Sequence, residues 1–396
     1  MKIIPTPPPE NIKFRGFLTK RLTTCAQPVK GMSVLRARVK NHLHSDGLSD
    51  GFSLVELMIG LTLSLILTVA IISVYLAQKN IYKTNSAQAS IQNAESAIAA
   101  LVTPTIRAAG FSGCTTVLQA LSNLNAGGPA PLGALSTTAS MVMGYGSTAS
   151  SPITITDDNA TNSATATNWS PSLDASLTGH VEAVSDVLVV LGPVPGSQPI
   201  GVTTFTAGAN SLVLQNSTGI SVGQFAAVSD CLKASIFTIT AVAGTTVTHE
   251  AGAGALANAN AALAVNYPAG SQFVTLTQTA FFVASDPSGQ SSLVKASLNT
   301  NGTWTFQSLV PGVETMKVLY GIGANGSLTQ YVEANAVVNW GQIYAIRIGF
   351  LIEGQQGSST LPPTQFSVLG TTVNVPADNR LRHVFEMTIN IRNSAS

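Results

Sequence analysis

Gly51-Phe52-Ser53-Leu54-Val55-Glu56 is the stretch that decides the fold, because an uncharged and mostly apolar run follows it from Leu57 through Gln78. A helix needs about 20 such residues to cross a bilayer at a rise of roughly 1.5 Å per residue, and residues 57–78 exceed that number. The sequence therefore predicts one membrane-spanning helix near the N-terminus.

Glu56 is the one acidic residue at the start of this helix. A carboxylate at such a depth costs a few kcal/mol on insertion scales unless it finds a partner. Two interpretations follow from the residues alone. Either the helix is a signal anchor with Glu56 near the lipid headgroups, or Glu56 has a functional partner.

The whole block, with Leu57-Met58-Ile59-Gly60 after it, resembles the prepilin cleavage and methylation motif of type IV pilins and type II secretion pseudopilins. The resemblance implies that a prepilin peptidase cuts between Gly51 and Phe52 and N-methylates Phe52. Glycine suits the cut, because a residue without a side chain lets the backbone enter a close-fitting protease site. Glu56 would then be the assembly residue, which pairs with the terminal amine of a neighbouring subunit.

The charge is distributed unevenly along the 396 residues, of which 45% are hydrophobic and 9% charged. Of 19 basic and 18 acidic residues, nine and three lie in residues 1–51, which leaves 10 and 15 and a mature charge of −5. Basic residues before the apolar run keep the N-terminus in the cytoplasm. With the resemblance to prepilins, this orientation implies a single-pass inner-membrane protein before assembly, and afterwards a subunit of a periplasmic or cell-surface pilus.

Three segments follow from these patterns. Residues 1–51 are expected to be a basic prepilin leader, with Met32 as an alternative start. Residues 52–109 are expected to form a long helix whose part 52–75 is the transmembrane and assembly segment. Residues 110–396 are expected to form an extracytoplasmic β-rich domain with loops rich in Ser, Thr, Ala and Gly.

Apolar residues recur in the second half of the helix at spacings of four and three, which is typical of an amphipathic helix that packs on a domain. They are Ala87, Ile91, Ala94, Ile98 and Leu101.

Beyond a polar stretch at 121–180, in which we expect surface loops, the chain has the pattern of β structure. The predicted strands cover 186–191, 211–215, 224–228, 236–242, 273–283, 292–298, 313–320, 343–352 and 382–391. The last alternates apolar and polar residues, as a strand with one buried face does. The fold class is α+β: a long N-terminal helix packed on a C-terminal antiparallel β-sheet domain, like a type IV pilin.

A second resemblance is more specific. The residues from Ile106 to Cys114 resemble the helix exit of PilW-like minor pilins. Residues 313–322, 345–348 and 379–385, with Arg392-Asn393, resemble strands and the C-terminus of the same family. Cys114 and Cys231 are the only cysteines after the leader, so export predicts a disulfide between them, with two unpaired buried thiols as the alternative.

Catalytic motifs are not recognised. Gly321 to Gly326 match G-x-G-x-x-G, but strand-like residues follow where a phosphate-binding helix is required, so a hairpin turn is predicted. His180, His249 and His383 show no ligand or triad spacing, and Asp157-Asp158-Asn159 lacks the spaced acids of a calcium loop. We expect no enzyme activity, no catalytic residue, no cofactor and no metal.

Nucleic-acid binding is not expected either, because the mature charge is negative and basic residues do not cluster. Arg380, Arg382 and Arg392 are interpreted as a solvated strand face.

The resemblances imply a minor pilin that assembles with other minor pilins and the major pilin to prime or cap type IV pili, supporting pilus biogenesis, twitching motility, adhesion or DNA uptake. Its expected partners are the prepilin peptidase, those pilins and, before assembly, the inner membrane. A type II secretion minor pseudopilin and a tip adhesin are the alternatives.

Overall fold

A computed structural model of the protein describes residues 53–114, 120–135, 140–156, 161–206, 208–286, 289–324, 327–361 and 365–392. The expected leader 1–51, with Met32, and the processing residues Gly51 and Phe52 lie outside the described residues. The chain divides into two compact units, Met1–Leu65 and Ile66–Ser396, and each is described by itself.

Helix α1 (Leu54–Arg107) begins in the first unit and continues through the second. It ends where Gly110 takes a φ of 77°, a conformation that glycine adopts without strain. The backbone N–H of Gly110 donates to the carbonyl of Leu191 at 2.8 Å, so the chain joins the sheet directly after the helix.

The buried face of α1 in the second unit differs from the expected one at its C-terminal end. Ala87, Ile91 and Ile98 are buried as expected, and Ala94 is half-buried. Leu101, however, is 45% exposed, and its expected burial is wrong. The stripe continues instead from Ile98 in steps of four, through Val102 and Ile106.

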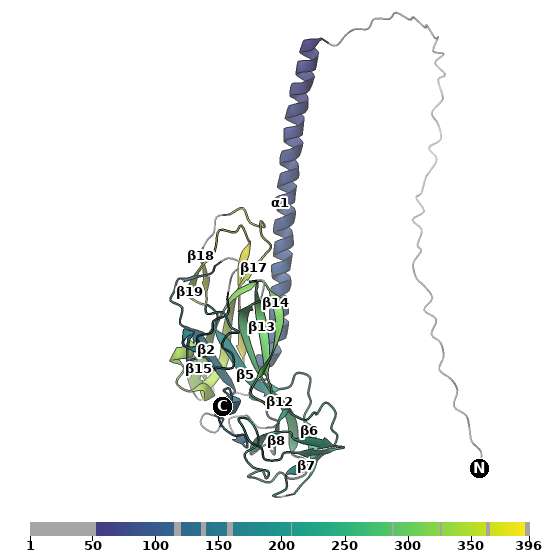
Figure 1. The fold of residues 1–396 in the computed structure, drawn as a ribbon, viewed down its shortest axis with the longest axis vertical. Coiled ribbons are helices and arrows are strands. Elements are labelled where there is room, and N and C mark those ends of the chain that lie inside the picture. The colour runs from purple at the N-terminus through teal and green to yellow at the C-terminus, as the bar shows by residue number, and fades with distance from the viewer. Residues whose placement is uncertain are drawn as a thin grey trace, which may run out of the picture. The chain divides into compact units, whose positions relative to one another are not determined.

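Among the described residues, the strands of the second unit form sheets of 13, four and three strands (Figure 1). The largest sheet contains β1 (Ala120–Ser122), β2 (Val142–Ser147), β4 (Trp169–Ser170), β5 (Val187–Pro193), β6 (Ile200–Phe205), β7 (Ser211–Leu214), β8 (Phe225–Ser229), β9 (Ala234–Thr238), β10 (Ala241–Ala243), β11 (Thr246–Thr248), β12 (Gln272–Ser285), β13 (Ser291–Leu298) and β14 (Trp304–Pro311).

The four-stranded sheet has the order β16-β15-β17-β20, and a small sheet has the order β18-β19-β3. Their bounds are β15 (Val313–Ala324), β16 (Ser327–Val332), β17 (Ile343–Glu353), β20 (Arg382–Asn390), β3 (Ile153–Thr154), β18 (Gln365–Val368) and β19 (Thr371–Asn374). Short 3-10 helices are η2 (Leu132–Ala134), η3 (Ala166–Asn168), η4 (Ala334–Ala336) and η5 (Trp340–Gln342). Apart from the pairs β1–β9 and β19–β3, the strand pairs among the described residues are antiparallel.

Strand β12 is the centre of the large sheet, since it pairs with β5, β6, β8 and β13. Its sequence is rich in aromatic and β-branched residues, and both faces are mostly buried. Residues on its two faces enter different hydrophobic cores, as Phe281 and Phe282 illustrate.

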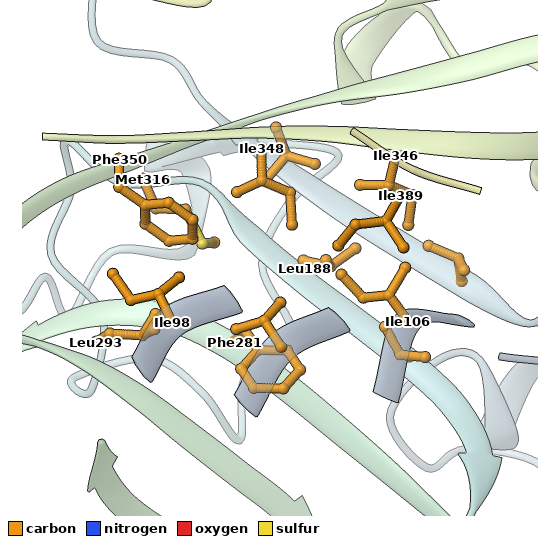
Figure 2. Close-up of a cluster of buried hydrophobic side chains, with 14 of the residues drawn as sticks. Ile98, Ile106, Leu188, Phe281, Leu293, Met316, Ile346, Ile348, Phe350 and Ile389 are labelled. Atoms are coloured by element: carbon orange, nitrogen blue, oxygen red, sulfur yellow. The ribbon is translucent and has the colours of Figure 1, made fainter. Parts of the chain in front are cut away.

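The first core lies between α1, the large sheet and the four-stranded sheet. Figure 2 shows Ile98 and Ile106 of α1 beside side chains from both sheets, among them Phe281 of β12 and Ile348 of β17. The helix is therefore held by burial of its inner face against strands distant in sequence. This is the α+β architecture predicted from the sequence, with one long helix and a mostly antiparallel β domain.

Candidate functional site

The start of α1 presents an apolar surface that no other part of the described chain covers. Every large apolar side chain from Leu54 to Leu76 is at least 51% exposed. By length and composition α1 could cross a membrane. A surface of this kind needs lipid or another protein to cover it.

Glu56 lies in the first turn of α1 and is exposed. A carboxylate there interacts favourably with the positive end of the helix dipole, by about 0.3–1 kcal/mol in water. Glu56 therefore contributes only modestly to the stability of the helix. Its expected pairing with a neighbouring subunit stays a prediction, as do cleavage after Gly51 and methylation of Phe52.

The expected disulfide is confirmed. Cys114 and Cys231 are joined, with 4.7 Å between their Cα atoms. Cys231 lies in the turn between β8 and β9, so the bond connects the segment that leaves α1 to the interior of the large sheet. Gly113 lies close to this turn, because a Cβ on it would be 3.2 Å from that of Ser229.

The interpretation of Arg382 as a solvated residue is wrong, because only 2% of its side chain is exposed. Its Nε and Nη2 donate to the two carboxylate oxygens of Glu314 at 2.8 Å each. Its Nη1 and Nη2 donate to the oxygens of Asp378 at 2.7 Å each. Two paired carboxylates make burial of this guanidinium tolerable.

Arg380 also belongs to this group and is not solvated. Its Nε lies 3.2 Å from Asp378 and 3.5 Å from Glu353, and 15% of its side chain is exposed. We call Glu314, Glu353, Asp378, Arg380 and Arg382 the ionic cluster. Arg392, the third arginine of the expected solvated face, is indeed exposed.

The electrostatics of the ionic cluster favour a neutral Glu353. Burial, and then the charge of Glu314, raise the pKa of the Glu353 carboxyl. Burial acts to raise the pKa of Asp378 too, but hydrogen bonds and the charges of Arg382 and Arg380 lower it below the usual value. With Glu353 protonated, two carboxylates face two guanidiniums.

The ionic cluster adjoins the place where the loop after β17 meets α1. A Cβ on Gly354 would lie 2.8 Å from that of Ala87, so only glycine permits this approach. Thr84 Oγ1 donates to the carbonyl of Ser358 at 2.8 Å, and His383 Nδ1 lies 2.6 Å from Glu95 Oε1. The cluster thus fixes the backbone on which the second half of the helix rests.

A second buried ion pair joins the two larger sheets. Lys317 Nζ of β15 lies 3.1 Å from Asp186 Oδ1, directly before β5. The other oxygen of Asp186 accepts from the backbone N–H of Val318 at 2.9 Å. Sequence reasoning missed Glu314 and Lys317 as structural residues. The available signal was two opposite charges inside one strand-like segment, residues 313–320.

The residues weighed for other chemistry do not come together. Gly321 to Ala324 end β15, Ser327 begins β16, and the two strands pair antiparallel, which confirms the hairpin. The turn residues Asn325 and Gly326, like 157–159, lie outside the described residues.

The three histidines have separate environments. His180 stacks on Phe306, His249 is fully buried beside Phe237, and His383 contacts Glu95. Among the residues that the structure describes, no group of three or more His, Cys, Asp or Glu side chains could hold a metal ion.

Comparison with known proteins bears on the C-terminal third of the chain. Residues 280–393 match the family model described as PilW, Type IV Pilus-assembly protein W. The matched region begins within β12 and includes β15, β17, β20 and the ionic cluster. The expected resemblance to PilW-like proteins is confirmed there.

Among solved structures, the chain is similar to a type IV-like pilin, TTHA1219 from Thermus thermophilus, at 16% identity. The match covers 44% of this chain and 87% of that one, with a TM-score of 0.20. A comparison with curated proteins finds no match.

Proposed function

We propose that this chain is a minor pilin, because its residues 280–393 match the family model described as PilW, Type IV Pilus-assembly protein W. It is inserted with its N-terminus in the cytoplasm, is cut after Gly51 and methylated on Phe52. It then assembles with other minor pilins and the major pilin to prime or cap the filament.

The observation that carries the proposal is the combination of this C-terminal region with the uncovered start of α1. A region that matches a pilus-assembly family, joined to a helix whose apolar start is exposed among the described residues, fits a subunit that other subunits or lipid must cover. Glu56, in the first turn of that helix, supports a charge-paired contact with a neighbouring subunit.

The size of the second unit favours a minor place in the filament. Its strands extend from Ala120 to Asn390, and a domain of this size at every position of a shaft leaves little room for its neighbours. A few copies at one end of the filament are not restricted by the space between neighbouring subunits.

Mass spectrometry of filaments sheared from the native host tests the proposal. We expect a peptide that begins with N-methylated Phe52, present in trace amounts beside the major pilin. A processed chain confined to the cell envelope, in cells that carry surface pili, contradicts the proposal and favours a secretion pseudopilin. An unprocessed chain contradicts both.

A further inference from the structure

The C-terminal end of α1 carries a groove with two arginine side chains that have no hydrogen-bond or ion-pair partner among the described residues. Arg107, Pro104 and Phe111 line it together with Arg392, Thr103 and Ala108, and its volume is about 540 Å³. The backbone N–H of Arg392 donates to the carbonyl of Arg107 at 3.4 Å, which brings the two positions together. Both arginines are exposed.

These arginines differ from the other exposed or half-buried ones in the described chain. Arg347 pairs with Glu386 at 2.8 Å, and Arg380 pairs with Asp378 at 3.2 Å. Arg107 and Arg392 have no carboxylate of the described residues within ion-pair distance. Two like charges at one groove repel each other, and an added carboxylate between them relieves that repulsion.

Capping of the helix end does not account for the two guanidiniums. Carbonyls in the last turns of α1 already accept from backbone N–H groups: Pro104 from Ala108, Ile106 from Ala109 and Arg107 from Arg392. Two side chains with five donors each are therefore left for a ligand.

The groove opens on the outward face of α1. The exposed residues Asn93, Ser96, Ala100, Pro104 and Arg107 recur at spacings of three and four, on the side opposite the buried stripe. A neighbouring subunit that packs along this side of the helix reaches the groove at its end.

We propose that this groove binds an acidic segment of a neighbouring pilin, with Arg107 and Arg392 as the groups that bind its carboxylate. The inference rests on the proposed function and names the chemistry of one subunit contact. Arginine forms two parallel hydrogen bonds with a carboxylate, and the apolar walls Pro104 and Phe111 keep water away from such a pair. A mature charge of −5 also indicates that a pilin of similar composition offers acidic groups.

Site-specific photo-cross-linking in the native host tests this contact. The full chain carries a benzophenone amino acid in place of Pro104, and sheared filaments are irradiated. We expect an adduct with a pilin peptide that contains Asp or Glu. The same probe at Val338, which is 99% exposed and distant in sequence from the groove, serves as the position control.

The charge is tested in the same assay with the double variant Arg107→Gln, Arg392→Gln. We expect at least a roughly tenfold smaller adduct yield, because the carboxylate loses both partners. The pair Arg107→Lys, Arg392→Lys keeps the charge and should retain more of the adduct. Arg347→Gln is the matched control, since its loss removes a surface pair elsewhere, and it should leave the yield unchanged.

The outcomes separate the inference from the function on which it rests. Three results would refute binding at the groove while the chain is still found processed in filaments: no adduct at position 104, an adduct with lipid, or an adduct whose yield is unchanged by the double substitution. The proposal that the chain is a minor pilin would stand in each case. A chain absent from filaments overturns both. A charge exchange would identify the pair directly: Arg107→Glu should lower the adduct yield, and replacing the cross-linked acidic residue of the neighbouring pilin with Lys should restore it.

Discussion

Glu56 contributes little to the stability of its own helix, so a substitution at this position tests assembly. We expect Glu56→Ala to be inserted and processed normally but recovered in sheared filaments at a small fraction of the wild-type level, because a neighbour's terminal amine loses its counter-charge. Immunoblots of filament and membrane fractions measure both steps. Glu56→Asp keeps the charge and should assemble better than Glu56→Ala, whereas equal recovery of Glu56→Ala and wild type would refute the pairing.

Arg382 stabilises the fold only through the two carboxylates that folding brings to it. We expect Arg382→Met to lower the free energy of unfolding by about 3–5 kcal/mol, because Glu314 and Asp378 stay buried without their partner. Urea unfolding of the detergent-solubilised chain measures the change. Arg347→Met is the control, and the loss of its exposed pair should cost less than about 1 kcal/mol. Equal losses would mean that the ionic cluster adds nothing beyond a surface pair.

Single residues also mark the limit of what the sequence reveals. The alternation of the last strand predicts which residues of β20 face the core, and Ile389 is buried while Thr388 and Asn390 are exposed. The same pattern treats Arg382 as a polar residue at the edge of a strand. Its two carboxylate partners come from positions 314 and 378, so local pattern gave no means of pairing them.

At the scale of elements, the two faces of α1 give a matched pair of variants on one helix. Ile98→Ala should lower the free energy of unfolding by about 2–5 kcal/mol, because it opens a cavity between the sheets. Leu101→Ala removes a side chain that is 45% exposed and should cost less than about 1 kcal/mol. Thermal unfolding of the two variants distinguishes them. A larger cost at Leu101 would show that the helix is rotated relative to the sheet.

Strands with a buried face were predictable, and exposed or polar strands were not. β5, β12 and β17 have long apolar runs that any period-based analysis finds. β14 is exposed along most of its length, and β2 lies within a stretch whose composition predicts loops. Composition was misleading at 121–180, since Trp169 and Leu177 from that stretch are buried in the second core.

For the whole molecule, the order of the strands could not be predicted from local pattern. β12 pairs with β5, β6 and β8 before it and with β13 after it, so the centre of the sheet depends on contacts between distant segments. The helix and the disulfide could be predicted directly, from the length of one apolar run and from a pair of cysteines.

The stability of the whole chain should depend on pH through buried carboxyls. Burial raises the pKa of Glu182 from 4.5 to about 7, against a hydrogen bond from Ser291 that lowers it. The folded chain then binds more protons than the unfolded chain between these values, so the free energy of unfolding falls as pH rises through that window. The loss from this group is on the order of 3 kcal/mol.

Glu182→Gln tests this dependence, because glutamine resembles the protonated acid. Urea unfolding should show the variant and wild type nearly equal at pH 5 and the variant more stable at pH 8. A difference that does not change with pH would contradict the assignment. The lowered pKa of Asp378 acts in the opposite direction, below its usual value of 3.8, and stays clear of this window.

The disulfide between Cys114 and Cys231 has a mechanical consequence. In the proposed filament, tension would enter this subunit along α1, and the bond lies directly after the helix ends. It closes a loop with a sequence separation of 117 residues, so roughly 400 Å of chain, at about 3.5 Å per extended residue, cannot be drawn out. Force passes instead from α1 to the turn between β8 and β9, where the ladder of β8 with β12 resists it in shear. An intact bond thus makes the subunit a short, stiff link, and a reduced one makes it a long, extensible tether.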